Sequence, residues 1–243
     1  MIKLLNKMSK INNFTVDRIG RPFYDNDAAV DHIAQGLRSG RRTVVVEHFL
    51  FPGYDDDRVA YINTVRQPWG RLNSYYCYTR YGSRKGAEAT LLAYGNQTLD
   101  ECVASLKWGK FDWQDNHCLN VDTQLKFFCG YLKDGTRAKC DMDLALSNLR
   151  GRYDVVGLTE HLQATVELLA ARFPAFFAGA PEILRTMKKE NTMDNAPANC
   201  KSTNATTMQI LATRSRRQMN DQKLYDEAAL LFWKCHEALA LVV

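Results

Sequence analysis

Apolar residues along this chain alternate between short β-branched runs and stretches in which they recur at helical spacing. A β-branched run bounded by polar or turn residues is typical of a buried strand, and spacing of three and four residues is typical of an amphipathic helix. The runs predict strands at 41–51, 59–65 and 154–158. The helical spacing predicts helices at 27–37, 68–81, 99–106 and 141–149, after Thr159 as N-cap, and from Asp221 onward. Strands alternating with helices favour an α/β fold with a parallel sheet.

Two segments lack such a pattern. Residues 1–22 are polar and basic, with no clear element, and residues 190–207 are rich in Asn and Thr, so a mobile loop is expected there. No internal repeat or linker interrupts the rest. A length of 243 residues is that of one domain, so a single domain over 1–243 is expected.

The chain is organised around the segment 58–82. A strand at 59–65 should end at Arg66, and Pro68 suits the first turn of a helix that runs to Tyr81, with Gly82 as its cap. Unpaired N–H groups and the helix dipole make such a turn a natural site for an anion.

Three residues make phosphate a specific candidate for that anion. Gly70 lies one turn before Ser74, so no side chain blocks the space in front of the serine hydroxyl. Arg66 could bind a phosphate with both arms of its guanidinium. The alternative is an ordinary salt bridge for Arg66 and a Ser74 hydroxyl bonded to its own helix.

Composition narrows the class of protein. Apolar residues make up 46% and charged residues 24% of the chain, as in globular proteins. The net charge of +5 would help to attract a polyanion but is too small for a dedicated nucleic-acid binder, so no nucleic-acid partner is expected. No apolar run is long enough to cross a bilayer.

The seven cysteines indicate an oxidising compartment. Cys102 and Cys118 flank one polar loop, and Cys129 and Cys140 flank another, without the spacing of a zinc site, so disulfides on loops are expected. The other cysteines and the glycosylation signals complete this picture. Cys77 and Cys235 lie in helical patterns and are expected as buried thiols, Cys200 is left unassigned, and acceptor sequences for N-glycosylation occur at Asn13, Asn96 and Asn204.

The central segment resembles the 3′-phosphate-binding segment of the Golgi sulfotransferases that use 3′-phosphoadenylyl sulfate (PAPS). It is most similar to that of the heparan sulfate and uronyl 2-O-sulfotransferases. The matching residues are Tyr61-Ile62-Asn63, Arg66, Pro68, Arg71, Ser74-Tyr75-Tyr76, Arg80 and Tyr81-Gly82, with Gln67 standing where the family usually has Asp. Further blocks match in the same order: TLDECVA (98–104), LKFFCGY (125–131), residues 153–180, ILRTMKK (183–189) and YDEAALLFW (225–233).

This resemblance implies a fold and a reaction. The fold would be a P-loop-NTPase-like, three-layer sulfotransferase domain with a central parallel sheet. The reaction would move a sulfuryl group from PAPS, without a metal, to the 2-O position of uronic acids in heparan or chondroitin/dermatan sulfate. The enzyme would act in the Golgi lumen on a glycosaminoglycan chain, tethered by a type II membrane anchor. Glucuronate or iduronate as acceptor, and a monomer or a homo-oligomer, remain open.

The resemblance also assigns roles to residues. Arg66 and Ser74 would hold the 3′-phosphate of PAPS, and Arg80 would contact a carboxylate or sulfate of the acceptor. A basic loop would close over the nucleotide, carrying Arg185, Thr186, Lys188 and Lys189; without the resemblance, a solvated basic surface is the simpler interpretation. The family's disulfides would pair Cys102 with Cys118 and Cys129 with Cys140.

Two family features have no match. No Gly/Ser/Thr-rich loop for the 5′-phosphosulfate precedes Arg41, so the first strand, that loop and the anchor are expected to be missing, leaving an N-terminally incomplete chain with weak or no turnover. The catalytic base is open: His48 lies on the expected strand but needs a small gap to align with the family's histidines. A catalytically impaired remnant that binds glycan or nucleotide is the alternative function. A kinase-like P-loop protein is disfavoured because no Walker loop is present.

Overall fold

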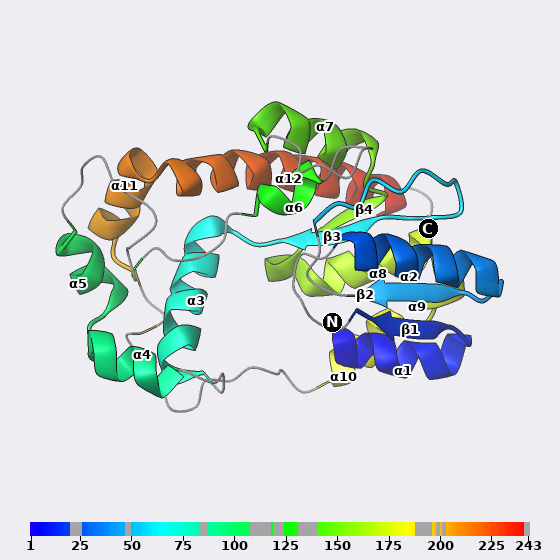
Figure 1. Cartoon of the computed structure of the whole chain (residues 1–243), viewed down its shortest axis with the longest axis horizontal. Helices are drawn as coiled ribbons and strands as arrows, with labels where there is room; N and C mark the ends of the chain where they lie inside the picture. The colour runs from blue at the N-terminus through cyan, green and yellow to red at the C-terminus, as the bar shows by residue number, and fades with distance from the viewer. Residues whose placement is uncertain are drawn as a thin grey trace. The chain divides into compact units, whose positions relative to one another are not determined.

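The structure, a computed structural model, describes residues 1–19, 26–46, 50–82, 87–106, 118, 124–130, 140–187, 196–197, 200 and 203–240. The chain divides into two compact units (Figure 1). Unit 1 comprises residues 1–65, 124–187 and 226–243, and unit 2 comprises residues 66–123 and 188–225.

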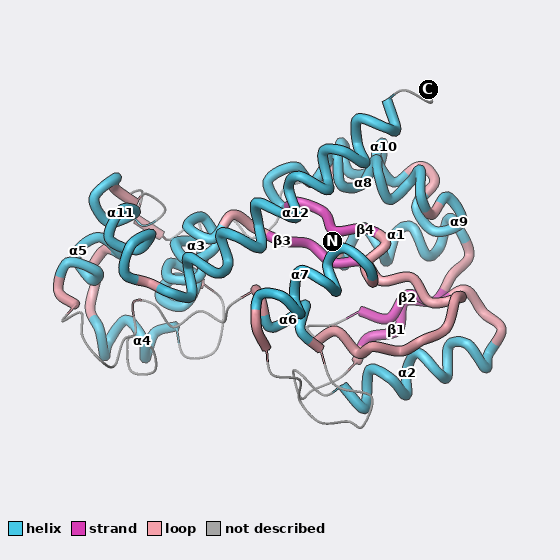
Figure 2. The backbone as a smooth tube through the Cα atoms, turned by 90° about the horizontal axis from the view of Figure 1, so that it is seen from above, coloured by secondary structure: helices cyan, strands magenta, loops and turns pink. Residues whose placement is uncertain are grey.

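Two pairs of parallel strands lie in unit 1 (Figure 2, magenta). Strand β1 (Thr15–Arg18) pairs with β2 (Thr43–Val46), with Thr15 opposite Thr43. Strand β3 (Ile62–Val65) pairs with β4 (Val155–Leu158), with Ile62 opposite Val155. The predicted mixture of helices and parallel strands is confirmed, and β2, β3 and β4 lie within the predicted β-branched runs. The three-layer, P-loop-like arrangement stays a prediction.

The N-terminal segment differs from the sequence-based expectation. The prediction of no clear element over 1–22 is wrong for α1 (Ile2–Asn12) and β1, which pairs in a sheet. Helix α1 buries Leu4, Leu5 and Met8, an apolar stripe at helical spacing among lysines and polar residues that the sequence-based expectation overlooked. A strand therefore precedes residue 41, and the predicted loss of the family's first strand is not confirmed.

Packing in unit 1 joins this N-terminal helix to the helices that follow β4. Its core contains Leu4, Met8, Val155, Val166 and Leu169, with further residues from α8 (Leu162–Arg172), α9 (Pro174–Phe177) and α10 (Ala180–Thr186). The remaining helices of this unit are α2 (Asn26–Ser39), α6 (Lys126–Cys129), α7 (Met142–Gly151) and the C-terminal part of α12 (Arg216–Ala240).

Two helix starts in unit 1 show where side chains bond to the backbone, and one of them tests the predicted cap Thr159. Asp141 caps α7, since its carboxylate accepts a hydrogen bond of 2.9 Å from the Leu144 N–H. Thr159 was expected to cap the helix after β4, and this prediction is wrong: Thr159–His161 forms a 3₁₀ turn (η1) and α8 begins only at Leu162. The buried Thr165 hydroxyl, rather than Thr159, bonds to the backbone at the end of β4.

Unit 2 is helical in its described residues. It contains α3 (Pro68–Tyr81), α4 (Ala87–Tyr94), α5 (Leu99–Ala104), α11 (Ala205–Arg214) and the beginning of α12. Leu72, Tyr76, Leu99, Val103 and Leu211 form its buried core. Helix α11 begins inside the segment expected as a loop, at Ala205, with the Asn204 side chain as its cap. Most of 190–204 lies outside the described residues. Among the described helices, none has both the length and the apolar character needed to span a membrane.

Candidate functional site

The turn between β3 and α3 has the form that the sequence predicts. Strand β3 ends at Val65, and α3 begins at Pro68, which occupies the first helical position where its missing N–H costs nothing. Arg66 lies in between and is half-buried. A Cβ atom built on Gly70 would lie 4.0 Å from Arg66 Nε, so the arginine side chain extends over the first turn of the helix. Ser74 follows one turn later and is also half-buried.

Gln67 modifies the anion site in one respect. Its side-chain oxygen accepts a hydrogen bond of 2.8 Å from the Gly70 N–H, and its carbonyl accepts one of 2.9 Å from the Arg71 N–H. The amide of Gln67 therefore caps the first turn of α3. Because two N–H groups of the first turn are already bonded, an anion here would depend on the Arg66 guanidinium, the Ser74 hydroxyl and the helix dipole.

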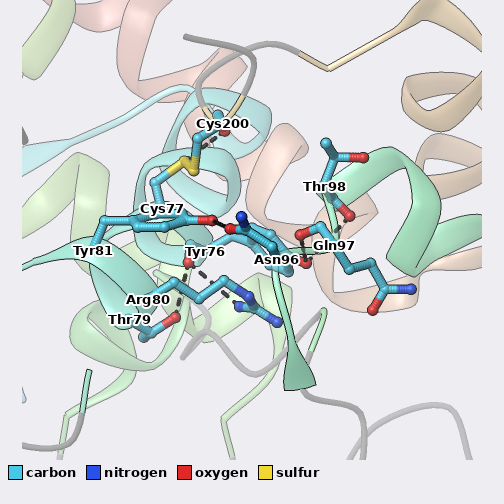
Figure 3. The surroundings of a disulfide bond; sticks show 9 residues. All are labelled: Tyr76, Cys77, Thr79, Arg80, Tyr81, Asn96, Gln97, Thr98 and Cys200. Atoms are coloured by element: carbon cyan, nitrogen blue, oxygen red, sulfur yellow. Dashed lines mark hydrogen bonds between the residues drawn. A yellow bond between two sulfur atoms is a disulfide. The ribbon is translucent and has the colours of Figure 1, made fainter. Parts of the chain in front are cut away.

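Helix α3 is fixed on several sides within unit 2. The Tyr76 hydroxyl donates to the Gln97 carbonyl at 2.7 Å, and Arg71 lies 3.8 Å from the buried carboxylate of Asp221. Cys77, fully buried, forms a disulfide with Cys200 (Figure 3). The prediction of a free thiol at Cys77 is therefore wrong, because a helical pattern cannot reveal a partner 123 residues further along the chain.

Arg80 lies inside unit 2. Its guanidinium carbon is 3.6 Å from the centre of the Tyr76 ring, its Nη1 donates to the Tyr76 carbonyl at 3.4 Å, and the residue is 2% exposed (Figure 3). Burial raises the pKa of the Tyr76 hydroxyl. This position favours a role in stabilising α3 through a cation–π contact. Contact between Arg80 and an acceptor stays a prediction.

The basic segment begins at the end of α10, in unit 1. The Arg185 guanidinium is exposed and lies 3.1 Å from Glu167 and 3.5 Å from Glu182. A hydrogen bond from Gln163, with the Arg185 cation, lowers the pKa of Glu167. The Thr186 hydroxyl donates to the Ile183 carbonyl at 2.9 Å. Lys188 and Lys189 lie outside the described residues.

Comparison with known proteins identifies the family. The chain is 37% identical to human and mouse heparan sulfate 2-O-sulfotransferase 1 over 134 residues, which is 54% of this chain and 36% of those proteins. It is 30% identical to the heparin sulfate O-sulfotransferase of Drosophila melanogaster over 195 residues, 76% of this chain and 52% of the relative. The chain belongs to the heparan sulfate 2-O-sulfotransferase family. No protein-family model matches it.

These matches cover only part of each relative's length. The chain spans about a third to a half of the length of the curated relatives it matches. The activity, substrates and partners of whole 2-O-sulfotransferases are therefore proposals for this chain.

The cysteines of this family member form three disulfides among the described residues. Besides Cys77–Cys200, Cys102 is bonded to Cys118 and Cys129 to Cys140, the two loop pairings that the sequence implied. Cys235 was expected as a buried thiol, and this prediction is wrong, because the residue is a free cysteine on the exposed side of α12. The side of α12 that turns inward carries Leu224, Ala228 and Phe232.

The candidate base His48 lies outside the described residues. The structure reveals another histidine contact: His32 Nδ1 on α2 lies 2.6 Å from Asp17 Oδ2 on β1. Nothing in the sequence indicated this pair, because β1 was not predicted. In the part of the chain that the structure describes, no three His, Cys, Asp or Glu side chains converge on a possible metal site.

Proposed function

We propose that this chain acts in sulfuryl transfer from PAPS to the 2-O position of uronic acid residues in heparan or chondroitin/dermatan sulfate. The observation that carries the proposal is the β3–α3 turn of a chain in the 2-O-sulfotransferase family, where the Arg66 side chain lies over the first turn of α3, one turn before Ser74. A cation and a hydroxyl beside the positive end of a helix dipole suit a phosphate.

In this proposal Arg66 and Ser74 hold the 3′-phosphate and so fix the position of the donor. Fixing the donor in line with the acceptor hydroxyl converts an encounter of two molecules into a reaction within one complex. The network around α3 supports this role, since Tyr76, Cys77 and Arg71 hold the helix in place.

The transfer forms a bond from sulfur to the acceptor oxygen and breaks the bond from sulfur to the 5′-phosphate oxygen. The acceptor proton passes to a base, for which His48 is the proposed residue. Positive charge stabilises the departing phosphate, and Arg185, Lys188 and Lys189 are its proposed source, while the Thr186 hydroxyl is a proposed hydrogen-bond donor of the same loop. Arg185 would exchange its contacts with Glu167 and Glu182 for phosphate oxygens when the donor binds.

The setting proposed for this reaction is the Golgi lumen. Three disulfides among the described residues are typical of a chain that folds in an oxidising compartment. The side chains of Asn13, Asn96 and Asn204, the three glycosylation acceptors, are exposed. Glycosaminoglycan is the proposed partner.

Binding of adenosine 3′,5′-bisphosphate, measured by isothermal titration calorimetry, tests the phosphate site directly. Arg66→Ala should weaken binding at least 100-fold, because it removes the bidentate charged contact. Arg58→Ala is the matched control, since Arg58 is an exposed arginine that pairs with Asp56 and should leave binding unchanged. Equal affinity of the Arg66 variant and the unmodified chain would exclude the site. Transfer of labelled sulfate from PAPS to 2-O-desulfated heparin tests the reaction.

A further inference from the structure

An exposed tryptophan on α12 lies among ionisable side chains of unit 1. Trp233 is 38% exposed, and its ring centre lies 4.9 Å from that of His161 and 5.6 Å from that of His236, both in edge-on contacts. His236 Nε2 lies 3.7 Å from Glu167 Oε2 on α8. These four residues, Trp233, His161, His236 and Glu167, are called the Trp233 patch below.

The packing of α12 does not account for this exposed indole. Its neighbour Phe232 is 2% exposed and, with Leu224 and Ala228, fills the side of the helix that faces inward. Trp233 thus keeps more than a third of its surface in contact with solvent, on a helix that is already anchored. An indole with an accessible face and hydrogen-bonding side chains beside it offers a ligand both an apolar surface and polar partners.

We propose that the Trp233 patch is a subsite for a pyranose ring of the glycan chain, outside the acceptor sugar. This inference rests on the proposed function, since it adds a contact with the same polysaccharide. A pyranose has a face of C–H groups that can stack on an indole and a rim of hydroxyl and anionic groups. The imidazoles of His161 and His236 and the carboxylate of Glu167 can hydrogen-bond to that rim.

The patch is continuous with the basic segment. Glu167 contacts His236 through one oxygen and Arg185, at 3.1 Å, through the other. Arg185 is a proposed donor-binding residue, so a chain that reaches the reaction centre can extend from it to Trp233. The Arg185 cation also offsets the Glu167 carboxylate, which would otherwise repel an acidic sugar.

A second copy of the chain is a less suitable occupant. The buried centres of protein interfaces are depleted of charged residues, whereas ionisable side chains surround this indole closely. A sugar satisfies both parts of the patch, because its apolar face and polar rim match the ring and its surroundings.

The length of the saccharide provides the test. With isothermal titration calorimetry on the chain, Trp233→Ala should weaken binding of a heparin octasaccharide about five- to tenfold, the range expected for one aromatic stacking contact. A disaccharide cannot fill both sites, so the variant should reduce the advantage of the octasaccharide over the disaccharide. Trp233→Phe retains a ring and should restore most of the loss. Leu92→Ala removes another exposed apolar side chain, 81% exposed on α4, and should have no effect.

Each outcome has a distinct meaning. Equal octasaccharide affinity for Trp233→Ala and the unmodified chain would overturn the subsite. Sedimentation that shows a dimer dissociating in Trp233→Ala, with unchanged saccharide affinity, would overturn it in favour of an interface between copies.

Adenosine 3′,5′-bisphosphate should bind the variant normally. If the unmodified chain does not bind this nucleotide, the proposed donor site fails, while the saccharide comparison still tests the patch. If the alanine variant does not fold, the comparison of Trp233→Phe with Trp233→Leu, which keeps apolar bulk without a ring, decides the question.

Discussion

At the scale of single residues, burial of the Tyr61 hydroxyl makes the free energy of unfolding depend on pH. The residue is 8% exposed, donates to the Tyr54 carbonyl at 2.9 Å and packs against Phe51 with ring centres 4.8 Å apart. Burial raises its pKa to about 12. Tyr153, beside it, also has a raised pKa because it is buried.

Stability should therefore decrease at alkaline pH. Above pH about 10 the unfolded tyrosines lose their protons, while the folded ones keep them until a higher pH. The stabilisation by the protonated form is complete below pH about 10 and is lost as the pH rises toward the folded pKa. The free energy of unfolding, from urea titrations, should fall by about 1 kcal/mol per pH unit for each such tyrosine between pH 10 and 12. Tyr61→Phe should make this slope smaller, while Tyr78→Phe, an exposed residue, should leave it unchanged.

Other single residues show where the sequence was informative. Pro68 marked the start of α3 correctly, because proline suits only the first turn of a helix. The role of Gln67 could not be predicted, since a cap depends on the rotamer of the amide. The same is true of Arg80, whose burial against Tyr76 is a tertiary contact without a local signal.

At the scale of elements, strand β4 and helix α8 lie so close together that only glycine fits at 157. A Cβ atom there would lie 2.1 Å from Thr165 Cγ2. The Thr165 hydroxyl accepts from the Leu158 N–H at 3.0 Å and donates to the Leu158 carbonyl at 3.1 Å, so helix and strand share two hydrogen bonds. This contact fixes the approach of α8 to the β3–β4 pair.

Gly157→Ala should destabilise unit 1 by about 1–3 kcal/mol, because the overpacked methyl group forces β4 and α8 apart. Denaturation by urea measures the change in the unfolding free energy. Thr165→Ser removes the clashing methyl group but keeps the hydroxyl, and should recover part of the loss when combined with Gly157→Ala. Gly151→Ala is the matched control, since a Cβ there meets nothing within 4 Å. A loss of stability as large in the control would contradict this explanation.

Elements with dense apolar runs were predictable. The run 154–158 and the helix from Pro68 to Tyr81 have dense apolar positions, and both are present. Strand β1 has a single apolar residue, whereas α1 was overlooked although its apolar residues recur at helical spacing. Tertiary contacts hold this region in place: Arg42 donates to the Asn12 and Ala175 carbonyls, each at 2.8 Å. Such contacts join residues far apart in the sequence, so local periodicity could not reveal them.

At the scale of the whole molecule, Cys77–Cys200 joins the two chain segments that form unit 2, which are separated by the residues of unit 1 between them. Neither cysteine has a partner close in sequence, and neither the loops flanked by cysteines nor the family resemblance, which implied the two loop disulfides, gave any sign of this one. The family assignment likewise came from several blocks along the chain, and not from any one pattern.

The Cys77–Cys200 disulfide should contribute more to stability than either loop disulfide. In the chain-entropy model, a cross-link stabilises the fold by restricting the unfolded chain, and the effect grows with the size of the closed loop. The loop here spans 123 residues, against 11 for Cys129–Cys140. Replacing both Cys77 and Cys200 with Ser should lower the free energy of unfolding by about 5 kcal/mol, against about 3 kcal/mol for the matched double variant of Cys129 and Cys140. Since Cys77 lies one turn after Ser74 on α3, only the first variant should also weaken binding of adenosine 3′,5′-bisphosphate. Urea denaturation measures the loss of stability in the two double variants, and isothermal titration calorimetry measures their affinity for the nucleotide. Equal nucleotide affinities in the two variants would show that the Cys77–Cys200 disulfide does not support the donor site.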